Sequence, residues 1–154
     1  MKTNLYLGAD HAGFTAKGQM MDFILKEYPQ FALQDEGTYS LASCHYPEMA
    51  MKVVQKMKED TLRGLDSKGI LICGSGIGMS VVANRFQGMN AALCHNVEEA
   101  VLSREHNNAN ILCLGARFLD EGKMQSIVSA WLKTKFLGGR HQERINLFTH
   151  LGTP

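Results

Sequence analysis

The sequence carries almost no excess charge, because 16 Lys and Arg residues stand against 15 Asp and Glu residues. A net charge of +1 excludes the strong positive field with which proteins hold a nucleic-acid backbone or an anionic membrane surface. No apolar run reaches the ~20 residues that span a bilayer, and residues 1–10 lack the pattern of a signal peptide. We therefore expect a cytoplasmic protein that binds neither nucleic acid nor membrane, and whose anion sites are local.

Cysteine is also scarce. The four cysteines are far apart in the sequence and lack C-x-x-C spacing, at positions Cys44, Cys73, Cys94 and Cys113. This spacing argues against a zinc site or a disulfide framework and favours reduced thiols in a cytosol. The six histidines show no metal-ligand spacing either, so we expect no metal.

What the sequence does contain is an alternation of short apolar runs with stretches of helical period. Strands are predicted at residues 4–7, 31–34, 69–73, 90–93 and 110–114, and helices at residues 15–26, 47–57, 79–85, 97–104 and 121–136. This order is typical of an α/β fold, here a three-layer doubly wound (Rossmann-like) sheet of about five parallel strands with helices on both faces. The 154 residues suit one domain, with residues 58–68 as a polar surface connection and residues 138–154 as a basic C-terminal tail.

Four turns of this predicted fold carry polar chemistry. They are Asp10-His11 after the first strand, residues 73–78 after the third, His106-Asn107 just before the fifth, and Arg117 just after it. Ligands of such folds bind outside the carboxyl ends of the strands. We expect the four turns to meet in one crevice and to form the binding site.

The turn after the third strand is rich in glycine and reads Cys73-Gly74-Ser75-Gly76-Ile77-Gly78. Its successive N–H groups can form a nest for an anion or a developing oxyanion. A dinucleotide site needs a glycine where Met79 stands, and a P-loop needs a lysine, so the sequence favours neither. A free cysteine is usually a small buried hydrophobe, but at a strand's end beside a helix N-terminus its thiol can serve as base or nucleophile.

The polar side chains of the other turns have two interpretations each. His106 can exchange protons near neutral pH, or it can belong to a cluster that caps a helix end. Asp10 can bind a substrate or cap the first helix. Arg140 and Arg144 can be ordinary surface charges, yet four residues apart on a short helix they share a face suited to a phosphate. The residues alone leave these alternatives open.

Taken together, four motifs resemble type B ribose-5-phosphate isomerase, within the family of ribose, galactose and allose phosphate isomerases. The motifs are Gly8-Ala9-Asp10-His11-Ala12-Gly13, Gly69-Ile70-Leu71-Ile72-Cys73-Gly74-Ser75-Gly76-Ile77-Gly78-Met79, Arg104-Glu105-His106-Asn107 and Gly138-Gly139-Arg140-His141-Gln142-Glu143-Arg144. The resemblance extends from Leu5 to about Phe148. One branch of the family has a glutamate in place of Met79, so this sequence is similar to the cysteine branch.

The resemblance implies a role for each matching residue. It implies that Cys73 abstracts a proton and that His106 donates one when the sugar ring opens. Substrate-binding positions are implied at Asp10, His11, Gly74, Ser75, Gly76, Ile77, Gly78 and Asn107, and phosphate-binding positions at Arg117, Arg140 and Arg144. The family also implies a homodimer, or a dimer of dimers, whose sites receive Arg140 and Arg144 from the neighbouring chain. Residues 138–154 are then a C-terminal tail that contacts the partner subunit.

The expected function is the interconversion of ribose 5-phosphate and ribulose 5-phosphate, a pentose phosphate pathway reaction, through an enediolate. Such an isomerisation removes no electron from the substrate, so we expect no cofactor. His45 stands where the family usually has aspartate, and a six-carbon sugar phosphate of allose or galactose is the alternative substrate. A non-catalytic sugar-phosphate sensor is a further alternative, which an intact Cys73 and His106 disfavour because ligand binding alone requires neither base nor acid.

Overall fold

The protein, described over residues 1–154 by a computed structural model, is built on one sheet of five parallel strands. The strands are β1 (Thr3–Ala9), β2 (Phe31–Asp35), β3 (Ser67–Cys73), β4 (Ala91–Leu93) and β5 (Ile111–Gly115). Their order across the sheet is β2-β1-β3-β5-β4. The predicted α/β fold with five parallel strands is confirmed.

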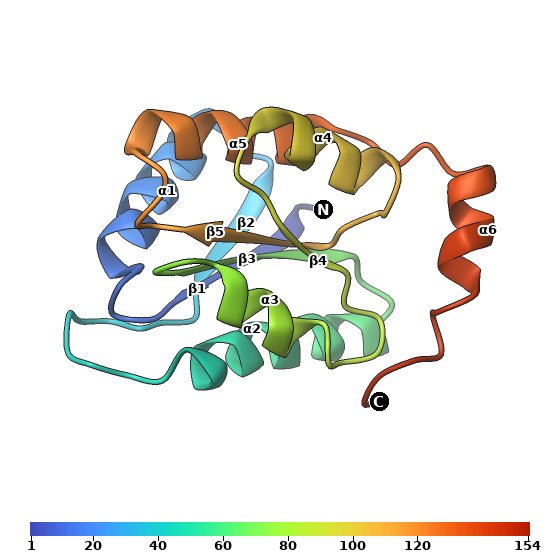
Figure 1. The fold of residues 1–154 in the computed structure, drawn as a ribbon, viewed down its shortest axis with the longest axis horizontal. Helices are drawn as coiled ribbons and strands as arrows, with labels where there is room; N and C mark the ends of the chain where they lie inside the picture. Colours follow the sequence, from blue (N-terminus) through green and yellow to red (C-terminus); the bar gives the residue numbers. More distant parts are fainter.

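Helices cover both faces of the sheet (Figure 1). One face carries α1 (Phe14–Glu27), α4 (Val97–Glu105) and α5 (Glu121–Lys133), and the other carries α2 (Tyr46–Leu62) and α3 (Ile77–Ala83). A short sixth helix, α6 (Arg140–Asn146), stands beside the sheet, at the side where the strands begin. None of the six helices combines the length and apolarity that a bilayer span requires.

Two hydrophobic cores form because successive side chains of a strand point to opposite faces of the sheet. Ile70 and Ile72 of β3 pack into the core beneath α1, α4 and α5. Leu71 and Cys73 pack into the core beneath α2 and α3. Each fully buried aliphatic side chain contributes about 1.5–3 kcal/mol relative to an exposed one. Cys73 is therefore fixed at the carboxyl end of β3, on the α2/α3 face.

The helix α2 is longer than the sequence pattern predicts. Residues 58–68 read as a surface connection, but α2 continues to Leu62. Its last turn is held by Asp60, which is 2% exposed and accepts hydrogen bonds from Tyr6 Oη at 2.7 Å and Asn4 Nδ2 at 2.9 Å. The polar residues around Asp60 occupy the solvent side of a helix that this contact anchors to β1.

The C-terminal tail leaves α5 earlier than predicted. The sequence pattern predicts helix to residue 136, but α5 ends at Lys133 and Thr134 is extended, with φ −78° and ψ 132°. Gly138 and Gly139 have φ of +67° and +57°, which glycine adopts readily, and they turn the chain into α6. The last residues then run back along the molecule, where Thr153 forms a bridge with Phe86.

Candidate active site

The turn after β1 is organised by Asp10, which is 7% exposed. Its Oδ1 atom accepts the backbone N–H groups of Ala12 at 3.0 Å and Gly13 at 3.1 Å, which forms an Asx turn in the residues just before α1. Oδ2 makes no hydrogen bond within the chain. Asp10 therefore holds the turn before α1 and does not cap the helix itself, and one carboxylate oxygen remains for a ligand.

His11 lies next to the loop that joins β2 to α2. Its Nδ1 atom accepts the backbone N–H of Cys44 at 3.2 Å. A ring nitrogen that accepts carries no proton, so neutral His11 has its proton on Nε2. His11 therefore offers a hydrogen-bond donor at the side of the sheet where the strands end, which we call the carboxyl edge. The side where the strands begin is the amino edge.

The glycine turn after β3 holds the sulfur of Cys73. The backbone N–H of Gly76 donates to Sγ at 3.1 Å. Gly76 has φ +75°, and a Cβ there would lie 2.6 Å from Leu93 Cδ1 and 2.9 Å from the carbonyl carbon of Leu114. Only glycine fits this position, and its conformation aims the N–H at the thiol.

The first residues of the turn, next to Cys73, leave two backbone donors unused within the chain. The N–H of Ile77 donates to Ser75 Oγ at 3.2 Å, whereas those of Gly74 and Ser75 have no acceptor in the protein. Buried or half-buried N–H groups are normally paired, so two unpaired ones beside a thiol mark a place for an external oxygen.

Arg117 lies against this turn. A Cβ on Gly74 would be 3.0 Å from Cζ of Arg117, and the backbone N–H of Arg117 donates to the Gly74 carbonyl at 3.0 Å. The exposed guanidinium has no salt bridge within the chain. The geometry brings Arg117 to the glycine turn, as predicted.

Tyr46 also lies at the glycine turn and was missing from the predicted site residues. A Cβ on Gly78 would lie 2.6 Å from Cε2 and Cζ of the Tyr46 ring, so the ring packs on the glycine. Tyr46 opens α2, with Pro47 in its first turn. The tyrosine-proline pair was visible in the sequence, but nothing in it indicated that α2 begins over the glycine turn.

The remaining thiols have surroundings that suit packing. Burial raises the pKa of Cys94 to about 11 and raises that of Cys113 further. Both thiols are therefore protonated at neutral pH. Cys44 is half-buried and contributes its backbone N–H to His11. Among the cysteines, Cys73 alone has its sulfur at the glycine turn.

A second group of polar residues lies at the amino edge of the sheet. His106 ends α4, and its ring stacks on that of His141 with centroids 4.2 Å apart and planes inclined by 13°. Burial, the adjacent His106 and then the two arginines of α6 lower the pKa of His141. Asn107 is exposed beside His106, and Arg140 and Arg144 are exposed on α6.

We expected all four turns to meet in one crevice, but within a single chain His106 and Asn107 do not lie with the other turns. A turn that follows a strand lies at its carboxyl end, whereas His106 and Asn107 precede β5 and lie at its amino end. Cys73 pairs with Gly115 and Gly69 pairs with Ile111, so about four residues of strand, or about 13 Å, separate the two edges. Arg140 and Arg144 lie beyond the amino edge on α6 (Figure 1).

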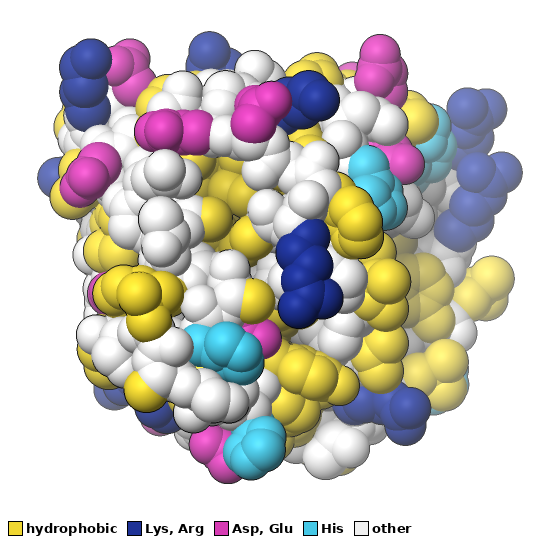
Figure 2. Space-filling model, turned by 60° about the vertical axis from the view of Figure 1, so that its left-hand side comes forward, with side chains coloured by type: hydrophobic (Ala, Val, Ile, Leu, Met, Phe, Trp, Pro, Cys, Tyr) yellow, Lys and Arg dark blue, Asp and Glu magenta, His cyan; other side chains and the backbone are white.

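The carboxyl edge of a single chain is an open surface. Figure 2 shows this face, where basic, acidic and histidine side chains stand near its middle amid uncharged and hydrophobic surface. A cavity of 640 Å³ lies at the carboxyl ends of β4 and β5, where His95 and Phe118 are among its lining residues, and Cys73 does not border it. No three histidine, cysteine or carboxylate side chains are grouped as metal ligands.

Comparison with known proteins identifies the family. Residues 5–148 match the family model described as Ribose/Galactose Isomerase. The chain belongs to the ribose/galactose isomerase family. One member from Mycoplasma genitalium, named probable ribose-5-phosphate isomerase B, is 40% identical over 95% of this chain and 93% of its own. The Escherichia coli ribose-5-phosphate isomerase B is 37% identical over 92% of this chain and 91% of its own.

Solved structures of ribose/galactose isomerases share the fold. The Thermotoga maritima ribose 5-phosphate isomerase is 40% identical, with a TM-score of 0.88 over 98% of this chain and all of that one. The Mycoplasma genitalium enzyme with bound ribulose-5-phosphate is 38% identical, with a TM-score of 0.89 over 97% of this chain and 95% of that one. The sheet, its helices and the turns that carry the two polar groups therefore belong to the family's architecture.

Proposed function

We propose that this protein interconverts ribose 5-phosphate and ribulose 5-phosphate, with Cys73 as the base. The observation that carries the proposal is the Cys73 sulfur beside two unpaired N–H groups of the glycine turn. Membership of the family and the ribulose-5-phosphate bound to the Mycoplasma genitalium relative support the substrate.

The chemistry needs one base and one oxyanion site. In the open-chain aldose the Cys73 thiolate takes the proton from C2, and the released electron pair forms the C1=C2 double bond of an enediolate. The N–H groups of Gly74 and Ser75 stabilise the charged oxygen, by about 3 kcal/mol for each well-aimed donor. The thiol returns its proton to C1 while the O2 proton passes to O1, which gives the ketose. The reaction moves protons only, and we propose that it needs neither metal nor cofactor.

The resemblance assigns ring opening to His106, which lies at the opposite edge of its own chain from Cys73. We propose that two copies pair about a twofold axis, so that His106 and Asn107 of one copy reach the Cys73 edge of the other. His106 then moves a proton between the anomeric hydroxyl and the ring oxygen. His11 and Asp10 bind the sugar at their own chain's edge.

The same pairing completes the phosphate site. Arg117 lies beside the glycine turn of its own chain, and Arg140 and Arg144 come from α6 of the other chain. Three guanidinium groups bind the remote phosphate and use its binding energy to position C1 and C2.

Exposed apolar side chains lie next to both parts of the proposed shared site, the glycine turn of one chain and α6 of the other. Ile77 and Val81 are 54% and 49% exposed on α3, next to the glycine turn. Leu147 and Leu151 are 78% and 60% exposed in the tail that follows α6. A homodimer of this kind buries apolar surface at both places, which is the usual driving force of association.

The mechanism also bears on the compartment. Cys73 must stay reduced to serve as a base, and all four cysteines are free thiols. We propose a cytoplasmic location, where thiols are kept reduced.

A coupled assay for ketose formation tests the function directly. Ribose 5-phosphate and allose 6-phosphate are supplied to the purified protein side by side, and we expect turnover of the pentose to exceed that of the hexose. Comparable rates would show that the protein does not prefer ribose 5-phosphate to allose 6-phosphate. Absence of turnover with both, together with retained binding, would favour a sugar-phosphate sensor.

A further inference from the structure

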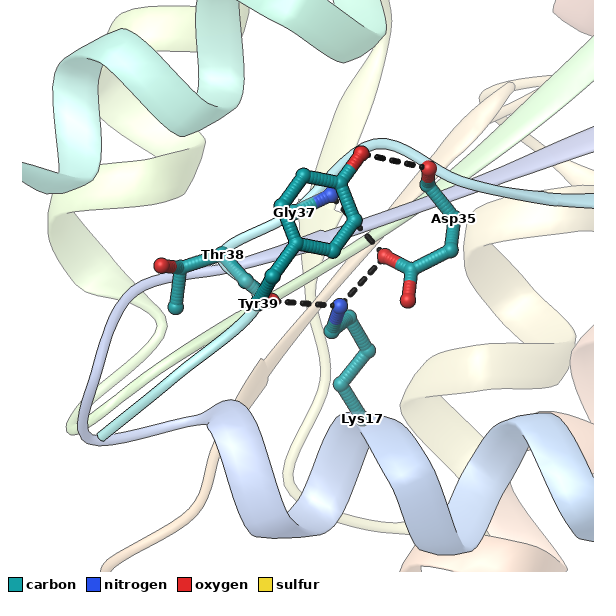
Figure 3. A network of polar contacts seen from close by, with 5 residues as sticks. All are labelled: Lys17, Asp35, Gly37, Thr38 and Tyr39. Atoms are coloured by element: carbon teal, nitrogen blue, oxygen red, sulfur yellow. Dashed lines mark hydrogen bonds and ion pairs between the residues drawn. The ribbon is translucent and has the colours of Figure 1, made fainter. Parts of the chain in front are cut away.

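Lys17 is a buried cation that neither the sequence motifs nor the proposed mechanism uses. It lies in the first turns of α1 and is 1% exposed. An ammonium in that environment is costly unless it is paired, and Lys17 pairs with a carboxylate and a backbone carbonyl (Figure 3). Nζ donates to the carboxylate of Asp35 and to the Thr38 carbonyl at 2.7 Å, and it lies 5.2 Å from the ring centroid of Tyr39.

Asp35 is the last residue of β2, and Thr38 and Tyr39 lie at the start of the loop at residues 36–45 that joins β2 to α2. Asp35 Oδ1 also accepts the N–H of Gly37 at 2.9 Å, and the Tyr39 hydroxyl donates to the Asp35 carbonyl at 3.0 Å. The start of the loop is thus held around the Lys17 ammonium and the Asp35 carboxylate by these hydrogen bonds.

The loop is at the same time tied to the last residue of β1. The N–H of Thr38 donates to the Ala9 carbonyl, and the N–H of Ala9 donates to the Gly37 carbonyl, both at 2.7 Å. The next residues along the chain are Asp10 and His11. Lys17 therefore holds the start of the loop beside the substrate-binding turn.

The end of the loop reaches His11 itself. The Cys44 N–H donates to Nδ1 of His11 at 3.2 Å, and this bond selects the neutral form with its proton on Nε2. The bond persists only while the loop keeps its shape. No other hydrogen bond within the chain fixes the ring of His11.

We propose that Lys17 is a positioning residue for His11. By holding residues 36–45 in place, it keeps the Cys44 N–H on Nδ1 and so presents Nε2–H as a fixed donor to the sugar phosphate. The identity of that ligand rests on the proposed function, whereas the tautomer of His11 does not. Lys17 itself cannot touch the ligand, because its ammonium is buried among loop atoms.

The tautomer is measured by ¹⁵N NMR of the histidine rings at a pH where they are neutral, with His11 assigned from the spectrum of His11→Gln. In the unaltered protein we expect Nδ1 unprotonated and the proton on Nε2. A proton on Nδ1 overturns the proposal, whatever any variant does. In Lys17→Met, an uncharged replacement of similar length, we expect the signals to move toward a mixture of both tautomers.

Kinetics of the same variant separate positioning from catalysis. We expect KM for ribose 5-phosphate to rise about tenfold, the scale of one hydrogen bond to a charged group, while kcat changes by less than about threefold. Lys68→Met is the matched control, because Lys68 is a half-buried lysine at the amino end of β3 with Nζ 5.9 Å from the Trp131 ring centroid. It should leave the His11 signals unchanged.

A double variant tests whether Lys17 acts through His11. In a His11→Ala background, Lys17→Met should raise KM by less than about twofold further. Two full, additive effects would show that Lys17 acts elsewhere and would overturn the proposal.

Tyr39→Leu is the replacement variant if Lys17→Met does not fold, since Tyr39 is 67% exposed. It should shift the His11 signals in the same direction, and unchanged signals count against the proposal. Absence of turnover in the unaltered protein would refute the proposed function while the NMR result still decides the tautomer.

Discussion

The backbone N–H of Gly76 points at the sulfur of Cys73, 3.1 Å away, from a residue held at φ +75°. Gly76→Ala puts a Cβ 2.9 Å from the Leu114 carbonyl carbon, so the backbone of the turn has to move. We expect turnover to fall at least about tenfold, because the donor to Sγ and the neighbouring oxyanion donors move with it.

Gly88→Ala is the matched control for that substitution. Gly88 also has positive φ, at +82°, but a Cβ there meets nothing within 4 Å. It should lose only the roughly 1–2 kcal/mol of left-handed strain in urea unfolding and keep its activity. Equal activity losses in the two variants would mean that the turn's fit around Cys73 is unimportant.

Cys73→Ala should lower kcat more than about a hundredfold, the scale of lost general-base catalysis, while binding of the sugar phosphate largely survives. The base and the phosphate-binding groups are separate side chains, which is why the two properties separate. Calorimetric binding and the coupled assay measure them. Cys94→Ala, at a buried thiol with a raised pKa, should change only stability. Near-normal turnover in Cys73→Ala would remove Cys73 from the mechanism.

Much of the carboxyl edge could be predicted from the sequence because its signals are local. An apolar run that ends at Cys73 and a dense group of glycines determine a strand, a turn and a helix start within a few residues. The α/β order of elements then places Asp10 and Arg117 at the same edge, since each follows a strand. The position of His106 was misjudged although its signal was present: a residue that precedes a parallel strand lies at the opposite edge.

Other features depend on contacts between distant segments that leave no local signal. Lys17 looks like an ordinary polar residue of an amphipathic helix, and its burial becomes visible only when β2 brings Asp35 alongside α1. Tyr46 packs on Gly78, 32 positions further along the chain, because α2 and α3 share one face of the sheet. The stack of His106 on His141 likewise requires the return of the tail, which the break at Gly138 and Gly139 only suggests.

Tyr6 should make stability depend on alkaline pH. Burial, followed by the hydrogen bond and negative charge of Asp60, raises the pKa of Tyr6 from 10.0 to about 12. A raised pKa adds stability that is fully present below pH 10 and is lost as the pH rises through 12. The free energy of unfolding of the unaltered protein should therefore fall, relative to Tyr6→Phe, by on the order of 2 kcal/mol over that window. Urea unfolding from pH 8 to 12 measures it, and parallel curves for the two proteins would contradict it.

Exhaustive treatment with a chelator should leave the isomerase activity unchanged. The proposed steps move protons between Cys73, His106 and the sugar, and no group of three metal-ligating side chains lies in the protein. The coupled assay is run before and after chelation, with a zinc enzyme treated in parallel as the control. Loss of activity that one added divalent metal restores would refute the metal-free mechanism.

The shared site predicts that two inactive variants restore each other. Cys73→Ala chains lack the base, and Arg140→Ala chains lack a phosphate contact that the proposed dimer supplies from the opposite subunit. When the two are refolded together, each mixed dimer has one doubly damaged site and one intact site. Random pairing makes about half of the dimers mixed, so roughly a quarter of all sites should be active, well above either parent.

The matched control replaces Arg140→Ala by Arg117→Ala. Arg117 packs on Gly74 of its own chain, so its loss damages the site that contains the intact Cys73 of that chain. Mixing Cys73→Ala with Arg117→Ala should therefore give only the average of the two parental activities. His106→Asn should behave like Arg140→Ala, because both residues lie at the amino edge. If Arg140→Ala and His106→Asn also give only the parental average while mixed dimers form, the two edges do not meet between subunits and the shared-site proposal is wrong.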